Sequence, residues 1–464
     1  MAFDLSALRA GYGAFLRDDR ILLTGHSHQA WPDVARDAQM ATFDDAATYV
    51  DDKWGAAVFP KIESVSRRVL ARMGFAETDG LALGKSTHEL VFRLLSCLKW
   101  HEKPRIVTST SEFHSLHRQL SRLAEEGVEV VWVDATDRAT LAQRVIDACT
   151  PGTAMVALSA VLFEDSFVVR EIGDVIAHAA SIGAIPLIDA YHAFNVAPIA
   201  WGPAASAAFV TAGGYKYAQF GEGVCWLRVP EGSTLRPVYT GWFADFEALE
   251  GPRTHHVGYG PGGARFTGAT FDPSSVYRAD AVLEFQDRHG LDVATLRAIS
   301  IRQTTRIVER LEQRGAFAHA SLRSSRDPER RGGFVSLETP HAQDAVKRLR
   351  ERGVFTDARG DGLRLGPAPY LTDAEIDAGV DAVIDVLAGR LSKRDNLIGV
   401  PPPGGGAGGK PGRPDGSGGN PGGIADGSVK PGGKRPGGSP GMPPGGCAAG
   451  GGCWAGGCAR GGGC

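Results

Sequence analysis

The sequence predicts an α/β protein in which a large domain, built on a mostly parallel sheet, precedes a smaller α+β domain. In the first half of the chain, short runs rich in β-branched residues alternate with helical stretches, a pattern typical of a parallel sheet covered on both faces. After residue 275 the strand signal thins and long helical patterns take over. Beyond residue 397 a Gly/Pro-rich tract begins, which buries too little apolar surface to offset its ordering entropy.

The element boundaries follow from these patterns. Strands are predicted at 105–109, 128–134, 154–159, 185–189, 208–212 and 224–229, and in the smaller domain at 333–337 and 363–365. Helices are predicted at 54–73, 86–100, 172–182, 275–289, 293–314 and 372–391. The expected organisation is an N-terminal segment (1–45) that packs on the small domain, a large domain (46–270), a small domain (271–397) and a disordered tail (398–464).

Length and composition narrow the class of protein. The 464 residues exceed the ~250–300 at which a single core stops growing. A net charge of -3 gives no reason to expect a nucleic acid or an acidic membrane as partner. No apolar run approaches the ~20 residues of a membrane span. The amino terminus lacks the pattern of a secretory signal, so a cytoplasmic location is expected.

The seven cysteines fall into two groups. Cys97, Cys149 and Cys225 have apolar neighbours and are expected to be buried free thiols. The other four lie in the tail, at Cys447, Cys453, Cys458 and Cys464. Their spacing is not of the CxxC kind that holds zinc. A non-functional extension is the first interpretation of the tail, and soft-metal binding or cross-linking is the alternative.

The first chemical motif is AYHAFN, directly after the predicted strand IPLID. Asp189 ends that strand and His192 follows three residues later. In open α/β sheets ligands bind at the carboxyl ends of strands. A carboxylate there can keep a heterocyclic nitrogen protonated, as an electron sink requires. The alternative is an Asp that caps a helix or a turn.

The second motif is GGYKYAQFGEG, after the predicted strand at 208–212. Lys216 lies among Tyr215, Tyr217 and Phe220, and burial in such a pocket lowers an amine's pKa and makes it nucleophilic. The alternative is a surface lysine whose stem covers the tyrosines.

The third motif is LGKSTHELVFRLL, in which Ser86 and Thr87 open a predicted helix. Two hydroxyls and free backbone N–H groups at a helix start suit a phosphate, and plain N-capping is the alternative. A zinc HExxH motif is excluded because Phe92 stands where the second His is needed, and no metal site is predicted.

The order of these motifs resembles that of fold-type I pyridoxal phosphate enzymes, and within them the class V aminotransferase group and kynureninase. The matching segments are Asp189-Ala190-Tyr191-His192, Gly214-Tyr215-Lys216-Tyr217 (Gly for the family's Ser), Gly241-Trp242, Arg265-Phe266-Thr267-Gly268-Ala269-Thr270, and Arg364-Leu365-Gly366-Pro367. The resemblance covers roughly residues 15–395. It implies the fold-type I transferase fold, with a mostly parallel, seven-stranded type of sheet in the large, cofactor-binding domain.

The resemblance also implies roles for single residues. Lys216 would carry pyridoxal 5'-phosphate as a Schiff base and later move the substrate's α-proton. Asp189 would pair with the pyridine nitrogen, with His192 close behind, and Phe113 would stack on the ring. The phosphate would be bound by Ser86 and Thr87 with help from Tyr215, which could also donate a proton.

The remaining implied roles concern the substrate and a second subunit. Trp242 and Thr270 would reach the cofactor of the neighbouring subunit, so a homodimer is expected. Arg364 would bind the substrate's α-carboxylate with its planar fork. His114 is a further candidate for substrate contact. The segments Gly25-His26-Ser27-His28-Gln29 and Phe271-Asp272-Pro273-Ser274, both expected at the substrate pocket, depart from the kynureninase pattern.

The leading hypothesis is a hydrolase or lyase of the kynureninase type. It would cleave the side chain of kynurenine or another β-substituted amino acid through an external aldimine and a quinonoid. A class V aminotransferase would use the same residues. A cysteine desulfurase fits poorly because no cysteine lies between residues 226 and 446. A non-catalytic binding protein on the same fold is the alternative from another class.

Overall fold

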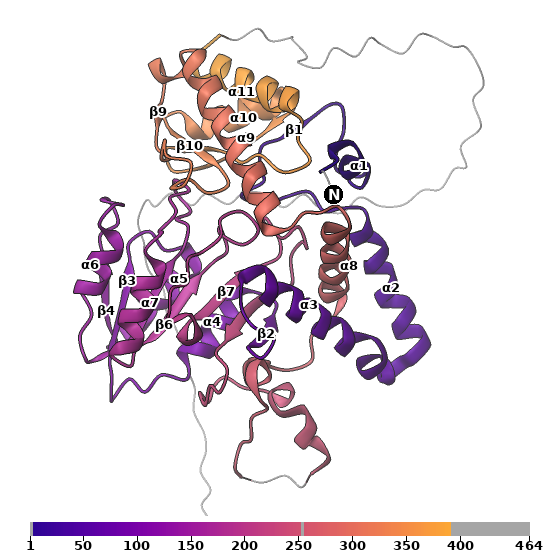
Figure 1. Cartoon of the computed structure of the whole chain (residues 1–464), viewed down its shortest axis with the longest axis vertical. Helices are drawn as coiled ribbons and strands as arrows, with labels where there is room; N and C mark the ends of the chain where they lie inside the picture. Colours follow the sequence, from indigo (N-terminus) through magenta and orange to yellow (C-terminus); the bar gives the residue numbers. More distant parts are fainter. Residues whose placement is uncertain (1–2, 252–254, 391–464) are drawn as a thin grey trace, which may run out of the picture. The chain divides into compact units, whose positions relative to one another are not determined.

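The computed structural model describes residues 3–251 and 255–390 (Figure 1). The helices are α1 (Leu5–Ala10), α2 (Val34–Tyr49), α3 (Phe59–Met73), α4 (Thr87–Leu95), α5 (His114–Glu125), α6 (Leu141–Asp147), α7 (Ile172–Ser181), α8 (Ser274–Arg288), α9 (Val293–Gln313), α10 (Ala342–Glu351) and α11 (Asp373–Leu387). Short helical turns lie at Val50–Asp52, Trp54–Val58, Ala205–Ala207, Trp242–Glu250, Gly262–Phe266 and Ala316–Ala318.

Within the described residues the strands form three sheets. They are β1 (Ile21–Leu22), β2 (Gly80–Gly84), β3 (Arg105–Ser109), β4 (Glu129–Val133), β5 (Thr153–Ser159), β6 (Ile185–Asp189), β7 (Phe209–Gly213), β8 (Cys225–Val229), β9 (Ser321–Leu322), β10 (Val335–Glu338), β11 (Val354–Phe355), β12 (Asp357–Arg359) and β13 (Gly362–Leu365). The large sheet has seven strands in the order β2-β8-β7-β6-β5-β3-β4. A second sheet has the order β12-β13-β10-β9, and β1 pairs with β11.

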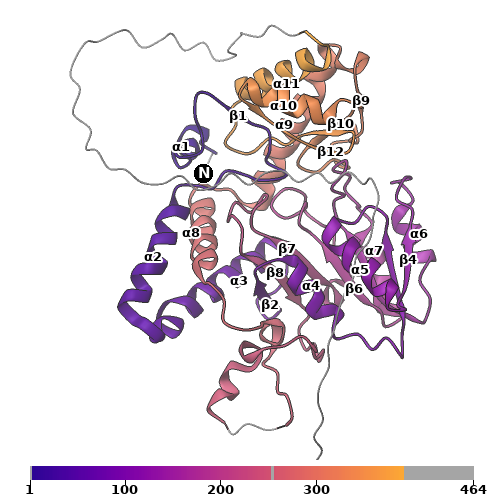
Figure 2. The same ribbon diagram turned by 180° about the vertical axis from the view of Figure 1, so that it is seen from behind.

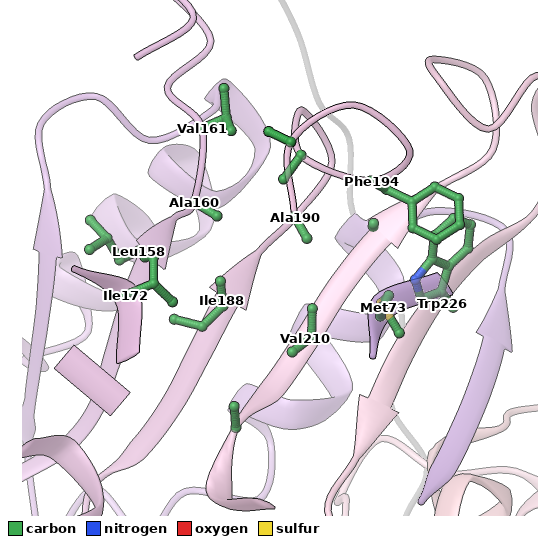
Figure 3. Packing of buried hydrophobic residues seen from close by; sticks show 14 of the residues in the cluster. Met73, Leu158, Ala160, Val161, Ile172, Ile188, Ala190, Phe194, Val210 and Trp226 are labelled. Atoms are coloured by element: carbon green, nitrogen blue, oxygen red, sulfur yellow. The ribbon is translucent and has the colours of Figure 1, made fainter. Parts of the chain in front are cut away.

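The large sheet is mostly parallel, as predicted. The pairs from β4 through β3, β5 and β6 to β7 are parallel, and only β8 and the edge strand β2 run antiparallel to their neighbours. Every residue of β5 is buried, as expected for a strand covered on both faces. In Figure 3, Leu158, Ile188 and Val210 from the neighbouring strands β5, β6 and β7 pack together in this core.

The helix predicted at 372–391 is shorter in the structure, where α11 ends at Leu387. Two other predicted helices differ from the observed ones for local reasons. The predicted helix at 54–73 consists of a π-helical turn, Trp54–Val58, followed by α3, because Pro60 has no N–H with which to continue the ladder. The predicted helix at 86–100 ends at Leu95, where the Ser96 hydroxyl donates to the Arg93 carbonyl at 2.7 Å.

The N-terminal segment shares a hydrophobic core with the last third of the described chain. Leu8, Tyr12 and Leu23 lie in the same buried cluster as Leu337 and Ile376. β1 and β11 form a parallel pair in which Ile21 faces Val354. Elsewhere α2 and α8 lie side by side (Figures 1 and 2). The domain boundaries stay predictions, and the predicted tail at 398–464, with its four cysteines, lies outside the described residues.

The three cysteines of the described ranges are buried to different degrees. Cys225 is buried, as predicted, whereas Cys97 and Cys149 are only partly buried; all three are free thiols. The expectation of burial was therefore wrong for two of them, because each sits at or just beyond the end of a short helix where one side stays open. None of the described helices combines the length and apolar character of a membrane-crossing helix.

Candidate active site

A cavity of about 180 Å³ lies where β5, β6 and β7 end and α4 and α5 begin. The predicted site residues that line it are Ser86, Thr87, Phe113, Asp189, His192, Tyr215 and Lys216. They come from four separate segments of the chain. The parallel sheet brings them together because its strands end at a common edge.

Lys216 lies on the loop after β7 and is buried, with 5% of its surface exposed. Its Nζ lies 2.9 Å from Nε2 of His192 and 4.4 Å from the ring centre of Tyr191. Burial lowers the pKa of Lys216 to about 7, against the raising effect of the Asp189 carboxylate. A large share of this amine is therefore neutral, and so nucleophilic, at physiological pH.

Asp189 is the last residue of β6, and His192 follows three residues later. One Asp189 oxygen accepts the backbone N–H of Tyr191 at 2.8 Å, which fixes the carboxylate at the cavity wall. Burial raises the pKa of Asp189, so a cationic partner in the cavity is favoured there. Burial also lowers the pKa of His192, with help from the Lys216 charge. His192 is thus neutral, and within the described residues its Nδ1 has no hydrogen-bond partner.

The start of α4 also lines the cavity. The Ser86 side chain is the N-cap and accepts the backbone N–H of Glu89 at 3.3 Å, while its phosphate role stays a prediction. Ser86 and Thr87 also face the cavity. The first N–H groups of a helix have no partners within the helix, and this end of α4 is therefore suited to an anion.

Aromatic side chains form much of the remaining wall. The Phe113 ring centre lies 5.1 Å from Lys216 Nζ and 5.7 Å from the ring of Phe163. Tyr215 stacks on the imidazole of His28, with ring centres 4.8 Å apart and an angle of 25°. Burial raises the pKa of Tyr215, which keeps its phenol protonated at neutral pH.

Arg364 is buried and already has a carboxylate partner. Its Nε and Nη2 donate to the two oxygens of Asp357 at 2.9 and 2.5 Å, and Nη1 donates to the carbonyl of Phe163 at 2.7 Å. Its charge lowers the pKa of both Lys216 and His192, after the larger effect of burial. Arg364 is thus coupled electrostatically to the lysine although it is not part of the cavity wall.

Besides Arg364, three of the predicted residues lie apart from this cavity. Trp242 is 42% exposed, and Thr270 lines a separate cavity of about 210 Å³ together with Lys85 and Arg93. His114 is the first residue of α5, and its ring lies 5.4 Å from that of Phe163. The roles predicted for Trp242 and Thr270 involve a second subunit and stay predictions.

Sequence reasoning missed a buried carboxyl behind the cavity. Glu112 accepts hydrogen bonds from the hydroxyls of Ser109 and Ser159, each at 2.6 Å, and Ser159 lines the cavity. Burial raises the pKa of Glu112 to about 7. The available signal was its place immediately before Phe113, three residues after the end of β3.

The fold is that of the fold-type I pyridoxal phosphate enzymes. A C-DES mutant with glycine covalently linked to its pyridoxal phosphate cofactor superimposes with a TM-score of 0.71. The match covers 81% of this chain and 99% of that chain at 17% identity. The predicted fold class is therefore confirmed.

Within this class the chain is similar to kynureninase, as its motifs predicted. Residues 296–383 match the kynureninase C-terminal domain. Kynureninase of Pseudomonas fluorescens is 25% identical over 393 residues, which are 79% of this chain and 89% of the relative. Kynureninase of Deinococcus radiodurans is 32% identical over 194 residues, covering 40% of this chain and 46% of the relative. The similarity also supports pyridoxal 5'-phosphate as cofactor.

Proposed function

We propose that the protein is a pyridoxal-phosphate-dependent hydrolase or lyase that cleaves the side chain of an amino acid, as kynureninase does. The observation that carries the proposal is that the Lys216 amine, the Asp189 carboxylate and the start of α4 line the same cavity. Burial lowers the pKa of this amine to about 7, so a large share of it is neutral at physiological pH. The similarity to two kynureninases supports side-chain cleavage over other uses of the same fold.

The residues of the cavity fit the proposed cofactor. Asp189 would pair with the ring nitrogen, Phe113 would stack on the ring, and Ser86, Thr87 and Tyr215 would bind the phosphate at the start of α4. The raised pKa of Asp189 supports this assignment, because a protonated ring nitrogen would supply the cation that the buried carboxylate lacks. When bound, the cofactor serves as an electron sink for the substrate's α-carbon.

Lys216 would first hold the cofactor and then act as the base. A base that works near neutral pH needs a pKa near 7, which is the value that burial gives Lys216. Its Nζ would remove the α-proton of the substrate, and neutral His192, 2.9 Å away, would accept a hydrogen bond from the amine. Tyr215 keeps its proton and would donate it late in the reaction.

Substrate binding is assigned to residues outside the cavity lining. Arg364 would hold the α-carboxylate, and His114 is the weaker candidate for a contact with the side chain. Trp242 and Thr270 would complete the cofactor site of a neighbouring subunit in a homodimer. The cytoplasmic location stays a prediction.

An absorption spectrum is the first test, followed by addition of kynurenine and 3-hydroxykynurenine. We expect a visible cofactor band and the release of the corresponding anthranilates. Lys216→Ala should abolish both, whereas Lys99→Ala, which changes a lysine that is 68% exposed, should change neither.

The other outcomes separate the alternatives. A Lys216-dependent band without anthranilate would redirect the search to other β-substituted amino acids. Conversion of an added keto acid would identify an aminotransferase. If no band formed even with added cofactor, the proposal would be wrong, and a non-catalytic binding protein would become the better interpretation.

A further inference from the structure

Asp357, whose side chain is 19% exposed, joins two buried residues, Arg364 and His26. Its Oδ1 accepts Nε of Arg364 at 2.9 Å and Nε2 of His26 at 2.7 Å, while its Oδ2 accepts Nη2 of Arg364 at 2.5 Å. The side chain of His26 is fully buried and that of Arg364 is 4% exposed. Both oxygens of Asp357 are thus engaged, so the carboxylate cannot rotate without losing a bond.

The backbone explains why these three side chains meet. Asp357 and Arg364 are directly opposite each other in the antiparallel pair β12–β13. His26 reaches them because β1 pairs with β11 and Thr24 bridges to Gly366. Gly366 has to be glycine at this point, since a Cβ there would overlap the His26 ring. The cluster is therefore built by strand register and not by chance side-chain contact.

The charges of the cluster follow from its burial. Burial, with help from the Arg364 charge, lowers the pKa of His26 to about 4, so His26 is neutral at physiological pH. Neutral His26 can therefore donate its Nε2 proton to Asp357. Burial would raise the pKa of Asp357, but the bonds from His26 and Arg364 outweigh it and keep the carboxyl ionised.

The cluster leaves a defined part of Arg364 free. A guanidinium has five N–H groups. Asp357 takes two of them along one edge, and the Phe163 carbonyl takes a third. One N–H remains on each terminal nitrogen, which leaves two charged donors for a substrate carboxylate. The ring of Phe334, 5.5 Å from Arg364 Cζ, packs against the guanidinium and against His26.

We propose that Asp357 and His26 are positioning residues that hold Arg364 in the orientation that selects amino acids, which carry an α-carboxylate, over the corresponding amines. This inference rests on the proposed function, in which Arg364 binds the substrate. Removing the Asp357 charge frees the guanidinium to rotate, and misplacement of a binding group by about 1 Å can cost up to ~100-fold.

The test compares ligands that differ only in the carboxylate. Spectral titration of the holoenzyme with L-kynurenine and kynuramine, and with L-alanine and ethylamine, gives two such pairs. Asp357→Asn should weaken binding of both amino acids roughly tenfold or more and leave both amines unchanged. For an amino acid that the enzyme converts, Asp357→Asn should raise KM far more than it lowers kcat. His26→Leu should act in the same direction, whereas His26→Gln, which retains an N–H donor, should be milder.

Asp361→Asn is the matched control, because it removes the ion pair with Arg323 from the same β12–β13 hairpin without touching Arg364. It should leave the preference for amino acids intact. Equal loss for amino acids and amines in Asp357→Asn would show a merely structural role and overturn the proposal. Tighter binding of the amino acids would also overturn it, because Asp357 would then be a competitor of the substrate.

Should Asp357→Asn fail to fold, Asp357→Glu keeps the charge but displaces the carboxylate, and the amino-acid preference should still fall. Failure of the proposed function would be visible separately, as a wild-type protein without a Lys216-dependent band.

Discussion

At the scale of single residues, the site depends on groups whose ordinary ionisation is shifted by burial. Lys216, His192 and Asp189 are each moved toward the neutral form. Such shifts cost folding free energy, because burial disfavours the charged state that the unfolded chain adopts. The site is therefore expected to be less stable than an apolar site of the same shape, and this is measurable.

Lys216→Met should stabilise the cofactor-free protein near pH 7. The pKa of Lys216 falls from 10.5 in the unfolded chain to about 7 in the fold, so between these values the unfolded state binds more protons. Stability of the wild type therefore rises with pH in this window, by at most about 1.4 kcal/mol per pH unit for one group. The advantage of the variant should shrink as the pH approaches 10.5, which chemical denaturation at several pH values can measure. A constant advantage would contradict the shifted lysine.

Gly213→Ala should destabilise the protein and weaken cofactor binding. Gly213 ends β7, and a Cβ there would overlap Sγ of Cys225 and the hydroxyl of Tyr191. Overpacking of this kind typically costs about 1–3 kcal/mol, measurable by urea unfolding. The control is Gly152→Ala, where the nearest atom is an ordinary 3.7 Å away and little change is expected.

At the scale of elements, α9 and α11 are joined by a ladder of ion pairs. Arg306 makes a bidentate ion pair with Asp377, and Arg310 makes one with Asp381. In each helix the two residues are one turn apart. The matching four-residue spacing on the two helices keeps the pairs in register. Above them, Arg302 pairs with Asp373 at the start of α11, where a negative charge also suits the helix dipole.

Asp377→Asn should lower the free energy of unfolding by no more than about 1 kcal/mol, because its partner Arg306 is 38% exposed and water screens the pair. The loss should diminish in about 1 M salt, where the screening length falls to ~3 Å. Urea unfolding at low and high salt measures both effects. A loss that is independent of salt would point to packing and not to charge.

Elements with a strong local pattern could be predicted, and those defined by distant partners could not. The strands 105–109 and 185–189 match β3 and β6 residue for residue, because β-branched runs end at turns. β2 was missed: its GLALG segment contains no β-branched residue and is a strand only because β8 pairs with it. Likewise the motifs singled out Lys216 and Asp189, which line the cavity, whereas nothing in the sequence singled out Asp357, because its contact with Arg364 comes from pairing across β12–β13.

At the scale of the whole molecule, the proposed homodimer would account for the exposed apolar residues of one segment. Val238, Tyr239 and Trp242 are 82%, 50% and 42% exposed, and the proposal places Trp242 in the neighbouring active site. Sedimentation should then give twice the 49.0 kDa of one chain.

Subunit complementation tests the shared site. Lys216→Ala and Trp242→Ala should each be inactive or strongly impaired alone. Mixed and reassociated, they should recover about a quarter of wild-type activity, because half the dimers are hybrids and each hybrid has one intact site. If mixing restores nothing, Trp242 acts within its own chain or not at all.

The pairing of β1 with β11 also has a consequence for the order of folding. Residues 21–22 cannot pair until residues 354–355 have been synthesised. β1 therefore forms only after most of the chain has been made. Contacts so far apart in sequence are slow to form. His26 and the cluster around Asp357 should therefore assemble late, after the seven-stranded sheet. The order of synthesis thus makes the residues of the lysine pocket available before those of the cluster that we propose distinguishes an amino acid from an amine.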